Sequence, residues 1–314
     1  MNGSMPRIAI VGAGLIGRAW AIVFARAGCE VALFDSDAAA LAGCRETIGE
    51  RLADLVEYGL IAESAPAVLA RITLAGSLRE ALAGALLVQE NVRETIAAKL
   101  AIYGELDALA ERESILASST SWIPASEFSA ELPGRARCLV AHPVNPPYLV
   151  PLVELSPAPW TAQETVARAK AIYEAVGQTP IVLRKEIRGF ALNRVQGAVL
   201  NEMLQLYAQG YVSVEDLDRL MKDGLGLRWS FMGPFETIDL NAPGGVLDYA
   251  LRYGQTYAQI AREHQPFDWN DDTLAAIARA RRAQLPAADL AERGAWRDRR
   301  LMALIAHKRN APRD

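Results

Sequence analysis

Short apolar runs alternate with helical patterns through the first half of the chain. RIAIVG (7–12) and EVALFD (30–35) predict buried parallel strands, with a helix from about residue 15 to 27 between them. Helical stretches separate most of the further apolar runs, which begin at residues 85, 114, 138, 151 and 180. This alternation is typical of an α/β fold with a doubly wound, mostly parallel sheet.

The pattern changes near residue 188. Apolar positions then recur at helical spacing, as in NRVQGAVLNEMLQLYAQG (193–210), and no run typical of a strand follows before the end. Ser213 precedes the acidic stretch VEDLD and is the expected N-cap of a helix. We therefore predict an α/β domain over residues 1–187 and a smaller all-α domain over residues 188–314.

Length, composition and charge narrow the class of protein. A chain of 314 residues is long for one core, which agrees with two domains. The net charge of -4 argues against a nucleic-acid or membrane-surface role, since both need a concentrated basic face. Cys29, Cys44 and Cys138 have no metal-binding spacing, so we expect no metal site. Their odd count suits reduced thiols and a cytoplasmic location.

A glycine-rich turn lies between the first predicted strand and the first predicted helix. GAGLIG contains Gly12, Gly14 and Gly17, and the second strand ends in Asp35, eighteen residues after Gly17. Alone the glycine pattern is weak, but this full context is what a Rossmann-type dinucleotide site requires. The glycines permit a tight turn and close backbone approach, and the helix N-terminus receives the pyrophosphate. A turn used only for packing is the alternative.

The charge around Asp35 indicates which dinucleotide is bound. Ser36 and Asp37 follow Asp35, and no arginine is near to neutralise a 2′-phosphate. Asp35 would accept hydrogen bonds from ribose hydroxyls, so NAD is favoured over NADP. Leu15 and Ile16, which follow Gly14, complete the expected cofactor-binding turn.

Oxidation of an alcohol by NAD needs a base for the hydroxyl proton, and histidine suits this near neutral pH. Three histidines are present, and His264 and His307 lie in polar stretches. His142 instead ends a predicted strand at its carboxyl end, where ligands bind in open α/β sheets. His142 is therefore the best candidate base. A histidine packed beneath a loop is the alternative.

A carboxylate lies close by in the stretch HPVNPPYLVPLVE (142–154). Glu154 follows Val153 and precedes Leu155, where burial of an unpaired charge is expensive. If Glu154 bonds to His142, it orients the imidazole and stabilises the imidazolium formed on proton uptake. The alternative is a glutamate on an edge strand that faces water.

These motifs together carry a resemblance that spans nearly the whole chain. GAGLIG, SSTS (118–121), HPVNP (142–146) and GFALNR (189–194) resemble the 3-hydroxyacyl-CoA dehydrogenase superfamily. The resemblance implies a catalytic group and two contacts with the nicotinamide half of NAD. The catalytic group is Ser121, His142, Glu154 and Asn193, and the two contacts are Glu94 and Lys99.

The finer resemblance is to the lambda-crystallin branch, whose enzymatic member is L-gulonate 3-dehydrogenase. SSTSWIPASEF, VAHPVNPPYLVPLVEL and DGLGLRWSFMGPFETIDLNAPG are similar to that branch. This resemblance implies a homodimer that oxidises the C3 hydroxyl of a small 3-hydroxy acid, with L-gulonate favoured. A 3-hydroxyacyl-CoA or carnitine dehydrogenase is the alternative within the same chemistry. A non-catalytic, crystallin-like NAD-binding protein is the alternative from another class.

Arg228 lies in the otherwise apolar segment GLRWSFMG. A buried arginine needs an anionic partner, and a substrate carboxylate held by a bidentate fork would serve. A local pair with Asp223 or Glu236 is the alternative. Arg228, Asn145 and Ser121 form the predicted substrate-binding set.

Overall fold

The computed structural model describes residues 5–269 and 272–311. The chain forms two compact units, one made of Met1–Arg194 with Gly294–Asp314 and the other of Val195–Arg293. Most of the last helix, α14 (Leu290–Asn310), therefore belongs to the first unit. The division into domains at residues 187 and 188 stays a prediction.

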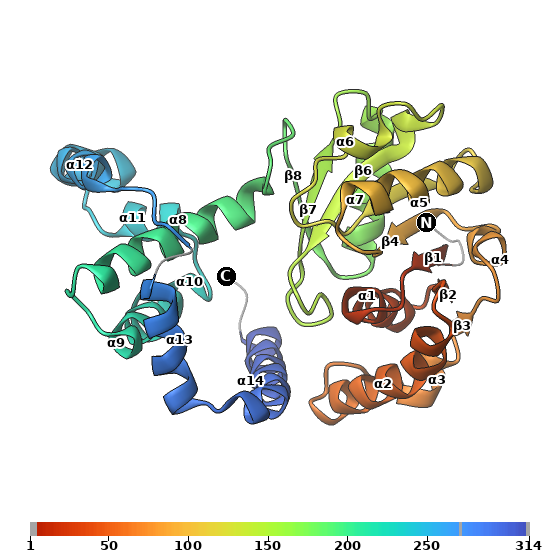
Figure 1. The fold of residues 1–314 in the computed structure, drawn as a ribbon, viewed down its shortest axis with the longest axis horizontal. Helices are drawn as coiled ribbons and strands as arrows, with labels where there is room; N and C mark the ends of the chain where they lie inside the picture. Colours follow the sequence, from red (N-terminus) through yellow and green to blue (C-terminus); the bar gives the residue numbers. More distant parts are fainter. Residues whose placement is uncertain (1–4, 270–271, 312–314) are drawn as a thin grey trace. The chain divides into compact units, whose positions relative to one another are not determined.

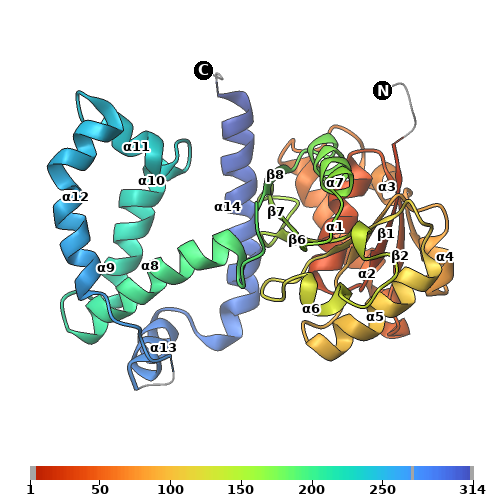
Figure 2. The same ribbon diagram turned by 90° about the horizontal axis from the view of Figure 1, so that it is seen from above.

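An eight-stranded sheet forms the centre of the first unit (Figure 1, Figure 2). Its order is β3-β2-β1-β4-β5-β6-β7-β8, and every neighbouring pair is parallel except β6 with β7. The mostly parallel sheet is thus confirmed. The strands are β1 (Arg7–Val11), β2 (Glu30–Phe34), β3 (Ile72–Leu74), β4 (Leu87–Glu90), β5 (Ile115–Ser118), β6 (Cys138–Pro143), β7 (Leu152–Pro157) and β8 (Thr179–Val182).

Helices cover both faces of this sheet, as a doubly wound fold requires. One buried cluster joins the sheet to α1 (Leu15–Arg26), α2 (Ala38–Glu57), α7 (Gln163–Ala175) and α14. The other joins the opposite face to α4 (Leu78–Leu82), α5 (Ile96–Leu109) and α6 (Ser126–Ser129). Because both faces are buried, the central strands are continuous apolar runs. The first unit also contains α3 (Ala65–Leu69) and a 3₁₀ turn (Arg135–Arg137).

Aromatic side chains and the last helix consolidate the first of these clusters. The ring of Trp20 on α1 lies 5.5 Å from those of Phe24 and Tyr173, centroid to centroid. Met302 of α14 is fully buried in the same cluster, and Arg309 donates a hydrogen bond of 2.9 Å to the Leu60 carbonyl. Burial of large side chains supplies roughly 25 cal/mol per Å² of apolar surface, so this contact holds α14 on the first unit.

The second unit contains only helices among its described residues, 195–269 and 272–293. α8 (Phe190–Ala208) begins in the first unit and continues into the second unit. Ser213 accepts a hydrogen bond of 3.1 Å from the Asp216 backbone, so the predicted N-cap is confirmed. The remaining elements are α9 (Val214–Arg219), a π-helical turn (Leu220–Leu225), α10 (Gly226–Trp229), α11 (Pro234–Leu240), α12 (Gly245–Glu263), α13 (Asp272–Gln284) and a 3₁₀ turn (Ala287–Asp289).

Candidate active site

The turn between β1 and α1 has the shape that a dinucleotide needs. A Cβ at Gly17 would lie 1.8 Å from the Gly12 carbonyl oxygen, so only glycine lets α1 start so close to the strand. Gly12 has φ +99°, and its Cβ would meet the Asn91 carbonyl at 2.7 Å. Beside Gly14, in contrast, no described atom lies within 4 Å of a Cβ. Among the described residues no side chain caps α1, so the first N–H groups of this helix are suited to a phosphate.

Asp35 lies immediately after β2 and is tied to this turn. Its Oδ2 accepts from the Ala13 backbone at 2.6 Å, and its Oδ1 accepts from the Asp37 backbone at 2.8 Å. Asp37 in turn caps α2. Within the described residues no arginine pairs with either carboxylate. The anionic edge predicted from the sequence is present, and it fits a ribose with free hydroxyls.

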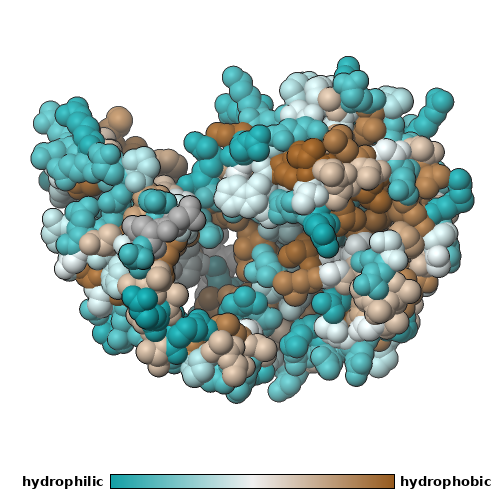
Figure 3. Space-filling model, in the orientation of Figure 1, coloured by the Kyte–Doolittle hydropathy of each residue, from teal (hydrophilic) through white to brown (hydrophobic). Residues whose placement is uncertain are grey.

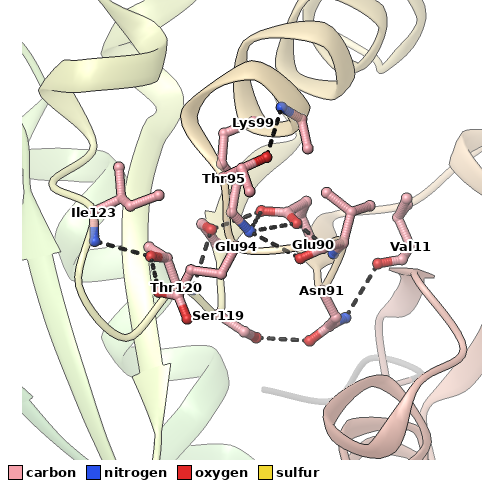
Figure 4. Close-up of polar contacts among 12 residues, drawn as sticks. Val11, Glu90, Asn91, Glu94, Thr95, Lys99, Ser119, Thr120 and Ile123 are labelled. Carbon is pink, nitrogen blue, oxygen red and sulfur yellow. Dashed lines mark hydrogen bonds and ion pairs between the residues drawn. The ribbon is translucent and has the colours of Figure 1, made fainter.

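A pocket opens at the carboxyl ends of β4 and β5, beside the start of α1 (Figure 4). Four residues predicted from the sequence reach it: Ile16, Glu94, Lys99 and Ser121. Its other lining residues are Asn91, Val92, Ser119 and Thr120. The structure therefore brings the expected nicotinamide contacts and the expected catalytic serine to one place.

Lys99 carries its charge in a buried ion pair. Its Nζ lies 2.7 and 2.8 Å from the two carboxylate oxygens of Glu90, and both side chains are almost fully buried. Glu90 also accepts from Ser118 Oγ and from the Val92 backbone, each at 2.6 Å. The charge of Lys99 is thus compensated inside the protein. Sequence reasoning missed Glu90, although a glutamate that ends the apolar run ALLVQE is a signal.

A second polar cluster supports the same pocket from the opposite face of the sheet. Ser119 Oγ donates to Asn91 Oδ1 at 2.7 Å and accepts from Gln89 and from the Trp20 indole at 2.7 and 3.0 Å. The Asn91 amide donates to the Gln89 carbonyl at 2.8 Å and to the Val11 carbonyl at 3.3 Å, and Figure 4 shows the second of these bonds. The hydroxyl of Ser119 is fully engaged, so this serine braces the pocket.

Ser121 lies on the turn that follows β5, and two side chains hold its backbone. Its N–H donates to Glu94 Oε1, and its carbonyl accepts from Asn193 Nδ2 at 2.8 Å. Asn193 comes from the first turn of α8, 72 residues away along the chain. Ser121 and Asn193, both expected in the catalytic group, are therefore in direct contact.

His142 and Glu154 form a buried pair. They are directly opposite each other on the antiparallel strands β6 and β7, so their side chains share one face. His142 Nδ1 lies 2.8 Å from Glu154 Oε2, while Glu154 Oε1 accepts from the backbones of Ala191 and Leu192, each at 2.9 Å. Glu154 is fully buried, so the alternative of a water-facing glutamate is wrong. The amino end of α8 and the imidazole compensate its charge.

The chain reaches this geometry through two residues in the left-handed region. Gly189 has φ +75° and Phe190 has φ +48°. Residues other than glycine rarely adopt this backbone conformation, which costs roughly 1–3 kcal/mol at Phe190. The Phe190 ring is fully buried and lies 5.4 Å from the His142 ring, centroid to centroid. This bend lets consecutive N–H groups of α8 reach Glu154 and lets Asn193 reach Ser121. Sequence reasoning missed Phe190, since GFALNR was used only for Asn193.

The other predicted substrate contacts are less connected. Asn145 is exposed on the loop after β6. Arg228 is exposed on α10 of the second unit, and among the described residues no carboxylate forms an ion pair with it; Asp223 pairs with Lys222 instead. The local pair with Asp223 or Glu236 is therefore not formed. A role for Arg228 and Asn145 in substrate binding stays a prediction.

Comparison with known proteins assigns the family. Residues 7–187 match the description "3-hydroxyacyl-CoA dehydrogenase, NAD binding domain", and residues 189–276 match the "C-terminal domain" of the same enzymes. The chain belongs to the 3-hydroxyacyl-CoA dehydrogenase family. It is an NAD-dependent dehydrogenase with a Rossmann-type fold, so the predicted cofactor and enzyme class are confirmed.

Several relatives are similar over most of their length. A lambda-crystallin homolog of Bos taurus is 43% identical, over 97% of this chain and 96% of its own. L-carnitine dehydrogenase of Streptomyces coelicolor is 37% identical, over 79% and 77%. A crystal structure of 5-formyl-3-hydroxy-2-methylpyridine 4-carboxylic acid 5-dehydrogenase, an NAD⁺-dependent dismutase, superposes with a TM-score of 0.85 at 26% identity, covering 98% of this chain and 100% of that one. The resemblance to the lambda-crystallin branch is thus confirmed.

Large apolar side chains are exposed on residues that adjoin the pocket-lining residues in the chain. Leu15 at the start of α1, Leu100 on α5 and Trp122 beside Ser121 are each half exposed or more. Figure 3 shows hydrophobic residues, in brown, on the visible surface of the first unit. Apolar surface at such a site is typical of a place where a ligand binds.

Among the described residues, no helix is long and apolar enough to span a membrane.

Proposed function

We propose that this dehydrogenase oxidises the C3 hydroxyl of a small 3-hydroxy acid, with L-gulonate as the preferred substrate and 3-dehydro-L-gulonate as the product. The observation that carries the reaction is the His142–Glu154 pair, which leaves Nε2 of the imidazole without a partner among the described residues. The similarity to lambda-crystallin relatives over nearly the whole chain supports a small acid. That branch is the one in which L-gulonate oxidation is expected from the sequence.

His142 is the base in this proposal. Glu154 accepts from Nδ1–H, so the ring keeps its unprotonated nitrogen, Nε2, for the C3 hydroxyl. As the proton arrives, the carboxylate stabilises the imidazolium. The two α8 N–H groups that donate to Glu154 Oε1 hold the carboxylate in place for this contact. When bound, NAD would supply the acceptor for the hydride that leaves C3.

Ser121 and Asn193 orient the C3 oxygen. The described residues offer no partner for the Ser121 hydroxyl, and Asn193 uses one amide hydrogen on the Ser121 carbonyl, which leaves the other available. Correct placement of a reacting group is worth several kcal/mol of the barrier. The four predicted catalytic residues thus act as two pairs, His142 with Glu154 and Ser121 with Asn193. The first turn of α8 contacts both pairs, through its N–H groups on Glu154 and through Asn193.

The cofactor would be held by the elements described above. Gly12, Gly14 and Gly17, with the backbone of Leu15 and Ile16, would receive the pyrophosphate. Asp35 would accept from the adenosine ribose. Glu94 and Lys99 would contact the nicotinamide half, in keeping with their place in the pocket.

Two other functions are weighed against this one. Oxidation of carnitine or of a 3-hydroxyacyl-CoA would use the same four residues, and these substrates differ only in the groups beyond C3. The similarity to an L-carnitine dehydrogenase supports this alternative. A non-catalytic crystallin-like protein would need no His142–Glu154 pair, and the intact pair argues against it.

A homodimer is part of the proposal. Leu247 and Leu251 on α12 are 76% and 86% exposed, and Phe235 on α11 is 82% exposed. Apolar side chains that gather on neighbouring helices are typical of a subunit interface.

The three free cysteines are buried, which suits the expected reducing cytoplasm.

The deciding experiment is an NADH-formation assay at mildly alkaline pH with L-gulonate, L-carnitine, 3-hydroxybutyrate and 3-hydroxybutyryl-CoA, with Arg228→Met in parallel. Preference for L-gulonate that Arg228→Met abolishes supports the small-acid proposal and its carboxylate clamp. Preference for the CoA thioester, unaffected by Arg228→Met, contradicts the substrate and leaves the catalytic group standing. NADH binding without turnover of any substrate would favour the non-catalytic alternative.

A further inference from the structure

We infer that Glu94 is a positioning residue for Ser121, in addition to its expected contact with NAD. The inference rests on the proposed function, because it concerns the serine of that same site. Glu94 precedes α5, and one of its two carboxylate oxygens, Oε1, receives three hydrogen bonds from the turn after β5. The donors are Thr120 Oγ1 at 2.6 Å, the Ser121 N–H, and the Trp122 N–H at 2.9 Å. Figure 4 shows Glu94 beside Thr120.

The turn needs this acceptor. Ser121 and Trp122 lie beyond β5, so their N–H groups have no partner in the sheet, and successive N–H groups form a concave site for an anion. The Thr120 N–H donates to Ser118 Oγ at 3.3 Å instead. Thr120 Oγ1 also accepts from the Ile123 backbone at 3.0 Å, which closes the turn on its other side. Hydrogen bonds to an ionised carboxylate are roughly twice as strong as neutral ones, so Glu94 fixes the backbone dihedral angles of Ser121.

Asn193 completes the restraint from the opposite side. With Glu94 on the Ser121 N–H and Asn193 on the Ser121 carbonyl, both backbone groups of this serine are bound to side chains. Only its hydroxyl is without a partner among the described residues. The direction of that hydroxyl therefore depends on Glu94.

The second oxygen of Glu94 has a different surrounding. Within the described residues Oε2 has no partner, and Glu94 lines the pocket together with Ile16 and Lys99. One carboxylate thus borders the cofactor pocket with one oxygen and holds the catalytic serine with the other. Removal of Glu94 should therefore damage turnover as well as cofactor affinity.

The kinetic test compares Glu94→Ala, which removes the acceptor, with Glu94→Gln, whose amide oxygen can still accept from the turn. We expect Glu94→Ala to lower kcat by up to about 100-fold, the scale of a misplaced reacting group, and Glu94→Gln to restore most of it. In a Ser121→Ala background, Glu94→Ala should lower kcat by less than about threefold, since coupled residues are not additive. A full additive loss in that background would overturn the inference.

A second measurement does not depend on the substrate. Hydrogen exchange of the peptide spanning residues 119–124 should accelerate in Glu94→Ala and stay near the wild-type rate in Glu94→Gln. Glu111→Ala is the matched control, because Glu111 Oε1 accepts from the Gly84 N–H at 3.0 Å at the amino ends of the strands. It should change neither this exchange nor the dissociation constant of NADH.

The two failures are distinguishable. A wild-type protein that turns over none of the four candidate substrates contradicts the proposed function, and exchange alone then decides whether Glu94 holds the turn. Unchanged exchange in Glu94→Ala overturns the inference whatever the kinetics are. Faster exchange confined to residues 119–124 supports it.

Discussion

His142 and Glu154 are twelve residues apart in the chain and directly opposite each other in the sheet, with Nδ1 and Oε2 separated by 2.8 Å. The register of two antiparallel strands sets this distance, and a shift of one strand by one residue would put the two side chains on opposite faces of the sheet. The pair is therefore as rigid as the sheet that carries it. Rigid placement of a base and its orienting carboxylate is what proton transfer requires.

His142→Ala should lower kcat by about 10²–10⁴-fold, because it removes the group that takes the proton. Ser121→Ala should lower kcat on the same scale, through lost positioning of the C3 oxygen. The NADH dissociation constant, measured by fluorescence, should be unchanged in His142→Ala. Near-normal turnover of His142→Ala would contradict the mechanism.

Glu154→Gln tests whether Glu154 sets the tautomer of the His142 imidazole. The two N–H groups of Ala191 and Leu192 require an acceptor, so the glutamine oxygen should face them and its NH₂ should face His142 Nδ1. The imidazole would then carry its proton on Nε2 and could not accept another. We expect kcat to fall about 100-fold or more, with folding intact. Normal kcat in this variant would show that Glu154 has no part in setting the tautomer.

Burial raises the pKa of the Cys138 thiol to about 12, from an ordinary value of 9.0. The folded protein therefore keeps this proton at pH 10, whereas the unfolded chain releases it, so the free energy of unfolding falls as the pH rises above 9. The loss at pH 10 is about 1.4 kcal/mol from this group. Urea unfolding should show that the free energy of unfolding of the wild type decreases between pH 8 and pH 10. In Cys138→Ala this decrease should be smaller by about 1.4 kcal/mol. Equal losses would refute it.

The ion pair of Glu90 and Lys99 should be costly to break on one side only. Lys99→Met leaves the Glu90 carboxylate buried and uncompensated, and we expect a loss of about 3–5 kcal/mol in the free energy of unfolding. Adding Glu90→Gln should recover part of that loss. Lys170→Met is the control, because its pair with Glu174 is half exposed on α7 and should contribute less than about 1 kcal/mol. Similar losses in Lys99→Met and Lys170→Met would contradict the buried-pair argument.

The sheet was predictable because strands buried on both faces are read as apolar runs. β3 was missed, since its three residues form no run, and the antiparallel direction of β7 could not be read because a strand pattern does not encode direction. A bond between His142 and Glu154 was considered from the sequence, and this contact is observed in the structure.

The contacts that hold the site were harder to predict. Glu94 meets Ser121 across 27 residues and Asn193 meets it across 72, and such partners are set by tertiary packing. The resemblance named all three residues but not their contacts with one another. Phe190 has no signal at all in the sequence, because only the backbone reveals its left-handed conformation.

Gly14→Ala and Gly17→Ala form a matched pair on one turn. At Gly17 a Cβ would lie 1.8 Å from the Gly12 carbonyl oxygen, so Gly17→Ala must displace the backbone of β1 or α1, and we expect strong destabilisation in urea. At Gly14 a Cβ meets nothing within 4 Å, and φ is -66°, so Gly14→Ala should fold with wild-type stability. Its methyl group would instead occupy the space where the pyrophosphate approaches, and we expect NADH affinity to fall at least about tenfold. Unchanged NADH affinity in a stable Gly14→Ala protein would show that the cofactor does not use this turn.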